Sequence, residues 1–170
     1  PVVVKRVLPH LVGDDAMVRM FVREAKILAN LRHPNIVDVY DFDREGDDYL
    51  MAMEYVNGYN LAYWRRYVQQ TRGQFAVEAA VHVAIQVLDA LHYAHTLTDS
   101  YGTPMVIVHR DVTPSNVLID TLGNVKLFDF GIARTERDAT EPDADGPKVK
   151  GKFPYIAPEI LGGAEPSPST

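Results

Sequence analysis

Cysteine is absent from the chain, and this absence excludes two classes of site. Without thiols there is no disulfide framework, and a bound metal must take oxygen or nitrogen ligands. A chain without disulfides fits a reducing compartment. We therefore expect it in the cytoplasm, even if a parent protein carries a membrane anchor elsewhere.

Long apolar runs and an excess of basic residues are absent as well. No run reaches membrane-spanning length, and residues 1–10 do not have the pattern of a signal peptide. The 17 Lys and Arg residues stand against 23 Asp and Glu, and the net charge of −6 argues against a nucleic-acid-binding surface. Hydrophobic residues make up 46% of the 170, which is enough for a globular core.

Residues 1–56 have the pattern of a small, mostly β layer with one helix. β-Branched residues open the chain and surround Lys5, which predicts a strand. Apolar residues three and four apart then predict an amphipathic helix. The expected elements are a strand at Val2–Leu8, a helix at Val18–Leu31, and strands at Ile36–Phe42 and Tyr49–Glu54 around a polar turn at Asp43–Asp48.

The pattern becomes helical after Asn57 and Gly58, so we expect an α+β fold with a β-rich part followed by a helical one. A long apolar stripe predicts one extended helix, and a later turn sequence predicts a hairpin. The expected elements are a helix over Ala80–His95, a hairpin of Val117–Asp120 and Asn124–Phe128, and a mobile loop over Thr135–Lys150.

Two charged residues of the first part are candidates for a functional pair. Glu24 lies between Phe21 and Leu28 in the helical pattern and so falls on the buried face, where a carboxylate needs a cation. Lys5 on the preceding strand can supply it, and an ammonium held in this way can bind phosphate oxygens. The alternative is that Glu24 turns to solvent and Lys5 is an ordinary lysine at a strand edge.

Three polar residues of the second part have the composition of a cation-binding site. Asp111 and Asn116 flank Pro114, which disfavours helix and leaves an irregular loop that can direct both side chains inward. Asp111 can accept a hydrogen bond from a substrate hydroxyl, while Asn116 and Asp129, next to Gly131, offer oxygen ligands of the kind that Mg²⁺ prefers. Each residue alone could cap a turn, and only their mutual spacing favours the site.

These segments together resemble the eukaryotic-type protein kinase domain that bacteria also use. Any one motif is weak, but their order and their secondary-structure context are typical of the family. The resemblance covers nearly the whole chain and implies a bilobal fold, with residues 1–56 as a partial N-lobe and hinge and residues 57–170 as a partial C-lobe. The matching motifs are Val3-Val4-Lys5, Glu24, His33-Pro34-Asn35-Ile36, His109-Arg110-Asp111 with Asn116, Asp129-Phe130-Gly131 and Ala157-Pro158-Glu159.

The resemblance also implies a role for each matching residue. Lys5 would hold the α- and β-phosphates of ATP, Glu24 would hold Lys5, and Asp111 would be the catalytic aspartate. Asn116 and Asp129 would bind Mg²⁺. The adenosine-binding set would be Met53 as gatekeeper, the Glu54 carbonyl, the Val56 amide, Val3 and Leu118 on the two faces of the ring, and Asn60 at the ribose. The residues that resemble the spine coupling the lobes are Leu28, Val39, His109 and Phe130.

Two parts of the family pattern are missing. The glycine-rich loop would precede Val2, and the helices that normally follow Ala157-Pro158-Glu159 are not present. We therefore expect the chain to be incomplete at both ends, and the 170 residues alone to be marginally stable and weak or inactive as a catalyst. The connection Thr96–Val106 is longer than usual and resembles an insertion in kinases of myxobacteria.

Two departures inside the pattern are linked in our interpretation. Ser/Thr kinases usually carry Lys where this chain has Thr113, and Thr where it has Lys152. We expect Lys152 to reach back toward Asp111 and to supply positive charge near the transferred phosphate. The alternative is that the exchange marks reduced activity. Residues 141–152 also lack hydroxyls, so an activating phosphate would have to lie on an earlier threonine, or a fixed carboxylate would replace it.

The predicted function is that of a Ser/Thr protein kinase, which moves the γ-phosphoryl group of ATP to a protein hydroxyl with the help of Mg²⁺. The main alternative is a pseudokinase that binds a nucleotide or a partner without chemistry. Against it stands the joint presence of Lys5, Glu24, Asp111, Asn116 and Asp129. Tyrosine specificity is disfavoured by Pro114. A small-molecule kinase of the aminoglycoside or choline type is disfavoured by Arg110.

Overall fold

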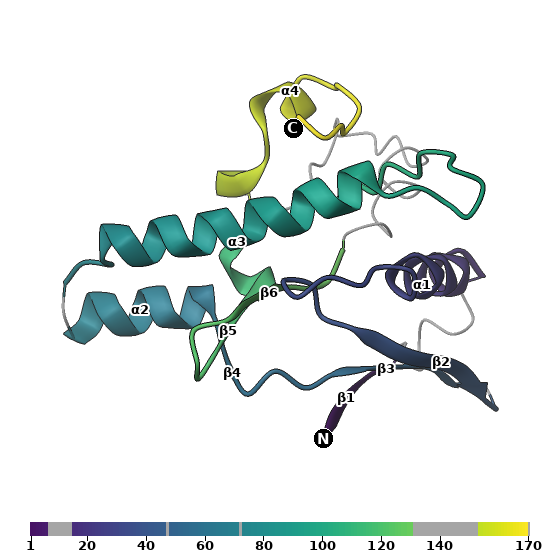
Figure 1. The fold of residues 1–170 in the computed structure, drawn as a ribbon, viewed down its shortest axis with the longest axis horizontal. Coiled ribbons are helices and arrows are strands. Elements are labelled where there is room, and N and C mark those ends of the chain that lie inside the picture. The colour runs from purple at the N-terminus through teal and green to yellow at the C-terminus, as the bar shows by residue number, and fades with distance from the viewer. Residues whose placement is uncertain (7–14, 47, 72, 131–152, 170) are drawn as a thin grey trace, which may run out of the picture.

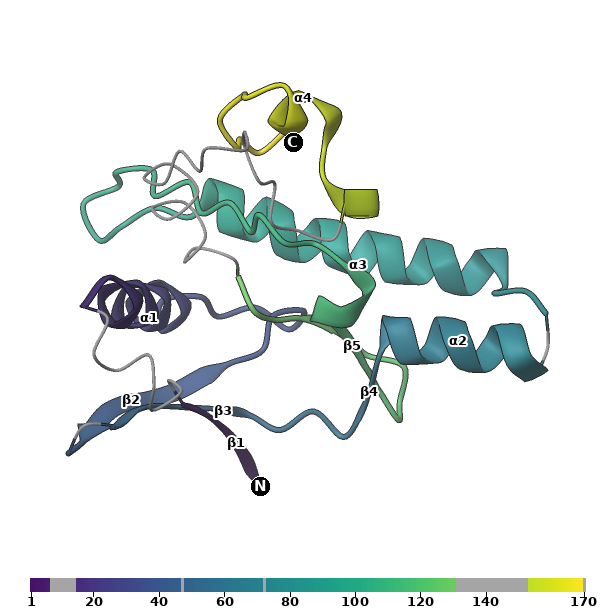
Figure 2. The same cartoon turned by 180° about the vertical axis from the view of Figure 1, so that it is seen from behind.

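The computed structural model describes residues 1–6, 15–46, 48–71, 73–130 and 153–169. Figures 1 and 2 show one sheet with α1 beside it at one end of the molecule, the helices α2 and α3 at the other, and a second sheet between them. The strands are β1 (Val2–Arg6), β2 (Val39–Glu45), β3 (Asp48–Glu54), β4 (Gly58–Asn60), β5 (Val117–Asp120) and β6 (Val125–Leu127). The helices are α1 (Asp15–Leu28), α2 (Leu61–Thr71), α3 (Val77–Thr96) and α4 (Pro158–Leu161), with short 3-10 turns η2 (Pro114–Asn116) and η4 (Phe153–Tyr155).

The first sheet has the order β1-β3-β2, and all its pairs are antiparallel. The predicted strand at Tyr49–Glu54 is confirmed, and the predicted turn is present but shorter than Asp43–Asp48. Glu45 pairs with Asp48 across a tight turn at Gly46, whose φ of 61° suits glycine. The polar residues before the turn are strand residues because β2 is an edge strand and its side chains there face solvent.

The segment before β2 does not form the predicted strand beginning at Ile36. Ile36 forms an isolated parallel bridge with Leu127 of β6, and the Val37 amide donates to the Leu127 carbonyl at 3.0 Å. Ile36 is an apolar residue that is buried beside β6. From the sequence pattern alone, such a residue cannot be distinguished from one that pairs in the first sheet.

Helix α1 ends at Leu28, three residues before the predicted end at Leu31. The Asn30 side chain donates to the Lys26 carbonyl at 2.7 Å, and the Leu31 amide donates to the Leu28 carbonyl at 3.0 Å. These bonds satisfy carbonyls of the last turn and let the chain leave the helix. Leu31 continues the apolar spacing because it still packs in the core, where it is fully buried.

The second sheet has the order β4-β5-β6, and the predicted hairpin is confirmed as β5 and β6. Helix α3 is confirmed, but its predicted stripe is only partly buried. Of the stripe, Val83 faces the core and Leu88 is exposed. Ala90 and Ala94, which the stripe did not include, are buried as well. Strand β4 and helix α2 are not predicted, because β4 has three residues and α2 buries no side chain completely, so neither has a clear apolar period.

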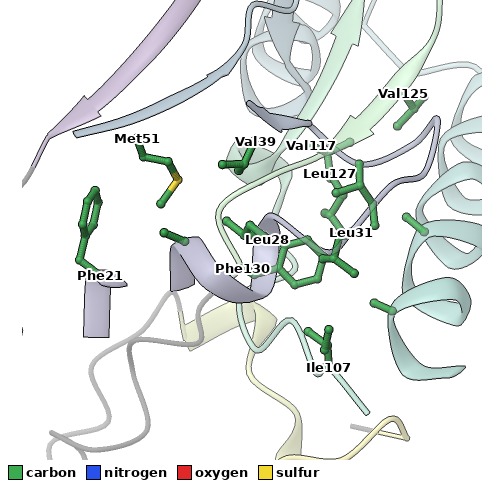
Figure 3. Close-up of a cluster of buried hydrophobic side chains, with 14 of the residues drawn as sticks. Phe21, Leu28, Leu31, Val39, Met51, Ile107, Val117, Val125, Leu127 and Phe130 are labelled. Atoms are coloured by element: carbon green, nitrogen blue, oxygen red, sulfur yellow. The ribbon is translucent and has the colours of Figure 1, made fainter. Parts of the chain in front are cut away.

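One cluster of buried apolar side chains joins the two parts of the molecule (Figure 3). Met51 and Val39 enter it from the first sheet, Leu28 from α1, and Leu127 from β6. Phe130, which follows β6, is among its most buried members. Burial of this cluster fixes β6 and the residues after it against the first sheet.

None of the helices in the described part of the chain combines the length and the apolar character needed to span a membrane.

Candidate active site

Strand β1 and the segment after β6 bring Lys5 and Asp129 together, although they are far apart in sequence. The Lys5 Nζ lies 2.7 Å from the Asp129 Oδ1. Asp129 has a φ of 60°, in the left-handed region, which a residue with a large side chain seldom adopts and which sets the direction of its carboxylate. Both side chains remain partly exposed, so the ion pair adds little to the stability of the protein. Its importance is that it places a cation next to a carboxylate at this position.

Asp111 and Asn116 form the second part of the site. The Asn116 Nδ2 donates to the Asp111 Oδ2 at 2.8 Å and to the Asp111 carbonyl at 3.0 Å. Pro114 begins the 3-10 turn η2 between them, as expected of a residue with a fixed φ and no amide hydrogen. Asn116 is buried, and its amide nitrogen makes both bonds, so its amide oxygen is the atom left to bind a cation.

His109 links these two parts. Its Nε2 donates to the Phe128 carbonyl at 3.2 Å, and its Nδ1 accepts the Asp111 amide at 3.2 Å. The Phe128 amide in turn donates to the Asn116 carbonyl at 3.1 Å. Through these bonds the residue before Asp129 is fixed to the loop of Asp111. The lysine, the two aspartates and the asparagine therefore lie in one connected site.

Burial lowers the pKa of His109 to about 4, although the hydrogen bond to Phe128 and the charges of Asp111 and Asp129 oppose the shift. At neutral pH the ring is therefore uncharged, with its proton on Nε2. Phe130 packs on the ring with 4.4 Å between centroids. Leu28 and Val39, the other residues of the predicted spine, are buried as well, and their coupling role stays a prediction.

The residues predicted to bind adenosine come from both sheets and from the link between them. Val3 pairs with Met53 in the first sheet, and Asn60 pairs with Leu118 in the second. Glu54 is the last residue of β3, and Val56 follows it in the short link to β4. The Asn60 Oδ1 accepts the Tyr63 amide at 2.9 Å, so this side chain caps α2, a role that the sequence analysis did not predict.

The family model for the protein kinase domain matches residues 1–170. The chain belongs to the protein kinase family. Among the relatives of this kinase chain, the tyrosine-protein kinase MasK of Myxococcus xanthus is 38% identical over 164 residues, which are 96% of this chain and 25% of MasK. The serine/threonine-protein kinase PrkC of Bacillus subtilis is 37% identical over 147 residues, 86% of this chain and 20% of PrkC.

Solved structures show the same kinase fold. The kinase domain of Mycobacterium tuberculosis PknI superposes with a TM-score of 0.66 at 28% sequence identity, over 98% of this chain and 57% of that one. The α+β, bilobal kinase fold that the sequence predicts is therefore confirmed. The chain spans little more than half of that kinase domain and about a quarter or less of the curated relatives named above.

The positions of two side chains with predicted roles, those of Glu24 and Lys152, are not described. Glu24 belongs to α1, but the structure does not describe its side chain, and Lys152 and the loop Thr135–Lys150 lie outside the described residues. Thr113, which replaces the usual lysine, is buried, and its Oγ1 lies 3.1 Å from the Ser115 Oγ. Its hydroxyl is thus directed within the loop.

Arg110, between His109 and Asp111, is a further candidate, because the sequence suggested it as a partner for an anion. Its φ of 65° places it in the left-handed region. Desolvation lowers its pKa, Arg23 of α1 lowers it further, and Glu165 opposes the shift. Arg110 thus feels both a like charge and a carboxylate, and its role as a partner for an anion stays a prediction.

The residues present fit the Mg²⁺ that the family uses. Within the described residues no group of three or more His, Cys, Asp or Glu side chains could hold a metal by itself. Magnesium in phosphoryl-transfer sites takes one or two protein oxygens and completes its shell with phosphates and water. The Asp129 carboxylate and the Asn116 amide oxygen would supply such a pair.

The sequence analysis missed Lys126. Its Nζ lies 2.9 Å from the Glu54 Oε2, across the boundary between the two sheets. The available signal was a lysine between Val125 and Leu127, both of which a strand pattern places on the buried face.

Proposed function

We propose that this chain is the catalytic part of a Ser/Thr protein kinase, which transfers the γ-phosphoryl group of ATP to a serine or threonine hydroxyl of a protein substrate. The observation that carries the proposal is the 2.7 Å contact between the Lys5 Nζ and the Asp129 Oδ1, connected through His109 to Asp111 and Asn116. This arrangement offers a cation for phosphate oxygens, an oxygen ligand for a metal, and a carboxylate for the acceptor hydroxyl.

In this mechanism Lys5 binds phosphate oxygens of ATP, and Asp111 accepts a hydrogen bond from the acceptor hydroxyl and so directs it. Asn116 holds the Asp111 carboxylate at 2.8 Å and limits its rotation. Mg²⁺, when bound, neutralises charge on the phosphate oxygens. Glu24 would hold Lys5 in place, and Lys152 would add positive charge beside Asp111.

The adenosine would lie between the two sheets. Val3 and Leu118 would contact the two faces of the base, with Met53 at its back. The Glu54 carbonyl and the Val56 amide would bind its polar edge. Because the Asn60 Oδ1 caps α2, its amide nitrogen would be the atom that meets the ribose.

The test uses the complete protein that carries this chain, Mg²⁺ and ATP, with a mixed peptide library as acceptor. Asp111→Asn should lower kcat by roughly 100-fold or more, since general-base residues contribute on this scale. Asp129→Asn should instead raise the Mg²⁺ concentration needed for half-maximal activity, because it removes a charged oxygen ligand. Asp89→Asn, a change at an exposed carboxylate on α3, is the control and should keep full turnover. ATP binding without any phosphoryl transfer by the unmodified protein would support the pseudokinase alternative.

A tyrosine acceptor is the second candidate, because one relative at 38% identity is named a tyrosine-protein kinase. Phosphoamino-acid analysis of the labelled peptides decides between the two. Phosphoserine and phosphothreonine are expected, and phosphotyrosine as the dominant product would overturn the Ser/Thr assignment.

A further inference from the structure

Lys126 and Glu54 form a partly buried ion pair that the reaction described above does not use. The Nζ and Oε2 atoms are 2.9 Å apart, and the side chains are only 17% and 21% exposed. Of the ion pairs in which both side chains are described, this is the least exposed. A pair in this setting is screened little by solvent, so its geometry is more restrained than that of a surface pair.

The pair joins the two parts of the proposed adenosine site. Glu54 is the last residue of β3, and Lys126 is the middle residue of β6. Lys126 is the cross-strand partner of Leu118, and cross-strand partners in an antiparallel sheet direct their side chains to the same face. The lysine therefore connects the strand pair that carries Leu118 to the residue whose carbonyl would bind adenine.

Backbone contacts hold Glu54 in the same arrangement. The Asp38 amide donates to the Glu54 Oε2 at 3.3 Å, and the Glu54 amide donates to the Asp38 carbonyl at 2.9 Å. Lys126 also makes a long hydrogen bond, 3.5 Å, to the Ile36 carbonyl. One ammonium group thus contacts the end of β3 and the linker before β2 from a position on β6.

We infer that Lys126 is a positioning residue for nucleotide binding, which sets the spacing between the Glu54 backbone and the Leu118 side chain. The inference rests on the proposed function, because it assumes that adenine binds between these two residues. Lys126 need not touch the nucleotide. It acts by fixing the Glu54 carboxylate, and with it the backbone that would bind the base.

Removal of the ammonium group should loosen this spacing. In Lys126→Met the Glu54 carboxylate keeps its hydrogen bond from the Asp38 amide but loses its cation. A partly buried carboxylate without a cation turns toward water. The end of β3 then loses its connection to β6. The two surfaces that would hold adenine no longer have a fixed separation, and binding has to restore it.

The experiment measures dissociation constants of Mg·ATP and of adenosine, together with kcat and KM for ATP, in the complete protein. Lys126→Met should raise both dissociation constants by the same factor, roughly tenfold, with kcat at saturating ATP within about twofold of the parent. The dissociation constant of adenosine must rise as much as that of Mg·ATP, because Lys126 is proposed to position the groups that bind the base and not those that bind the phosphates. Lys126→Arg retains the charge and should restore most of the affinity.

The matched control is Arg6→Gln, which removes a cation from a more exposed pair in the same sheet, 3.4 Å from Asp48. It should change neither dissociation constant. Glu54→Gln should raise the dissociation constants of both ligands as Lys126→Met does. The double variant should bind both ligands no more weakly than either single variant, because each change removes the same contact. These additional variants keep the inference open to test if Lys126→Met does not fold.

The outcomes separate this inference from the proposed function. If the unmodified protein does not bind Mg·ATP, the proposed function fails. If the unmodified protein binds ATP and transfers phosphate but Lys126→Met and Glu54→Gln bind adenosine as tightly as the parent, or more tightly, only the inference fails. A loss of affinity for ATP alone would also overturn it, because the effect would then act on the phosphates through Asp129.

Discussion

His109 shows how one buried side chain can make stability depend on pH. The folded protein holds its pKa at about 4, below the ordinary value of 6.5, because burial disfavours the charged ring. Between these two values the unfolded chain binds more protons than the folded one, so the free energy of unfolding falls as the pH falls. The ring also contacts Phe128 and Phe130, the residues on either side of Asp129.

We expect the metal-free complete protein to lose about 3 kcal/mol of stability between pH 6.5 and pH 4 through His109. Urea unfolding across this range gives the slope, and an NMR titration of the ring gives the pKa directly. His109→Leu should flatten the slope. Ile107→Val, which alters the buried core nearby without removing a titratable group, should lower stability and keep the slope. A ring that titrates near pH 6.5 would contradict the prediction.

Lys152 is the second residue with a testable role. Thr113 carries a neutral hydroxyl, which lies near Ser115, and so lacks the positive charge that a lysine in its place would bring to the transferred phosphate. We expect Lys152→Ala to lower kcat by roughly 10- to 100-fold in the complete protein, on the scale of losing one electrostatic contact to a transition state. Lys150→Ala, a neighbouring lysine, is the control. Normal turnover of Lys152→Ala would refute the role.

At the scale of elements, Gly58 fixes the contact between β4 and β5. A Cβ placed on it would lie 2.0 Å from the Ile119 carbonyl oxygen and 2.6 Å from the Asp120 Cα. Both are backbone atoms and cannot move aside without separating the strands. Because only residues 55–57 separate β3 from β4, the close approach also sets where the link from β3 meets the second sheet.

Gly58→Ala should therefore destabilise the protein by about 1–3 kcal/mol, as overpacking against backbone does, and should raise KM for ATP. Thermal unfolding and steady-state kinetics measure the two effects. Gly46→Asn is the control, because that turn has open space around the added atoms and asparagine tolerates its φ of 61°. Unchanged unfolding of Gly58→Ala would mean that β4 and β5 can shift apart freely.

The elements that the sequence predicts are those whose residues bury one face. The hairpin β5–β6 and the strand β3 were located from alternation and turn residues, and the charged positions of the site followed from motif order. The errors lie in elements whose side chains are largely exposed to solvent, because these elements have no regular apolar pattern. Edge strand β2 is polar because solvent reaches it, and α2 has no fully buried side chain. A lysine between two buried strand positions drew attention to Lys126 at most, and its pairing with Glu54 could not be predicted, because only the folded chain brings β6 and β3 together.

At the scale of the whole molecule, α3 carries an apolar surface that the described residues do not cover. Val77, Val81, Ile85 and Leu88 lie on one face of the helix and are between 51% and 73% exposed. Isolated apolar residues on a surface are common, but a continuous row along a helix favours association. We therefore expect the 170-residue chain to self-associate through this row.

The prediction for this surface is that Val81→Gln combined with Leu88→Gln shifts the isolated chain toward monomer in sedimentation velocity, because it removes apolar area from the row. Glu78→Gln combined with Asp89→Asn changes the same helix without removing apolar area and should leave self-association in place. An isolated chain that is monomeric without any substitution would show that this row of α3 does not drive association.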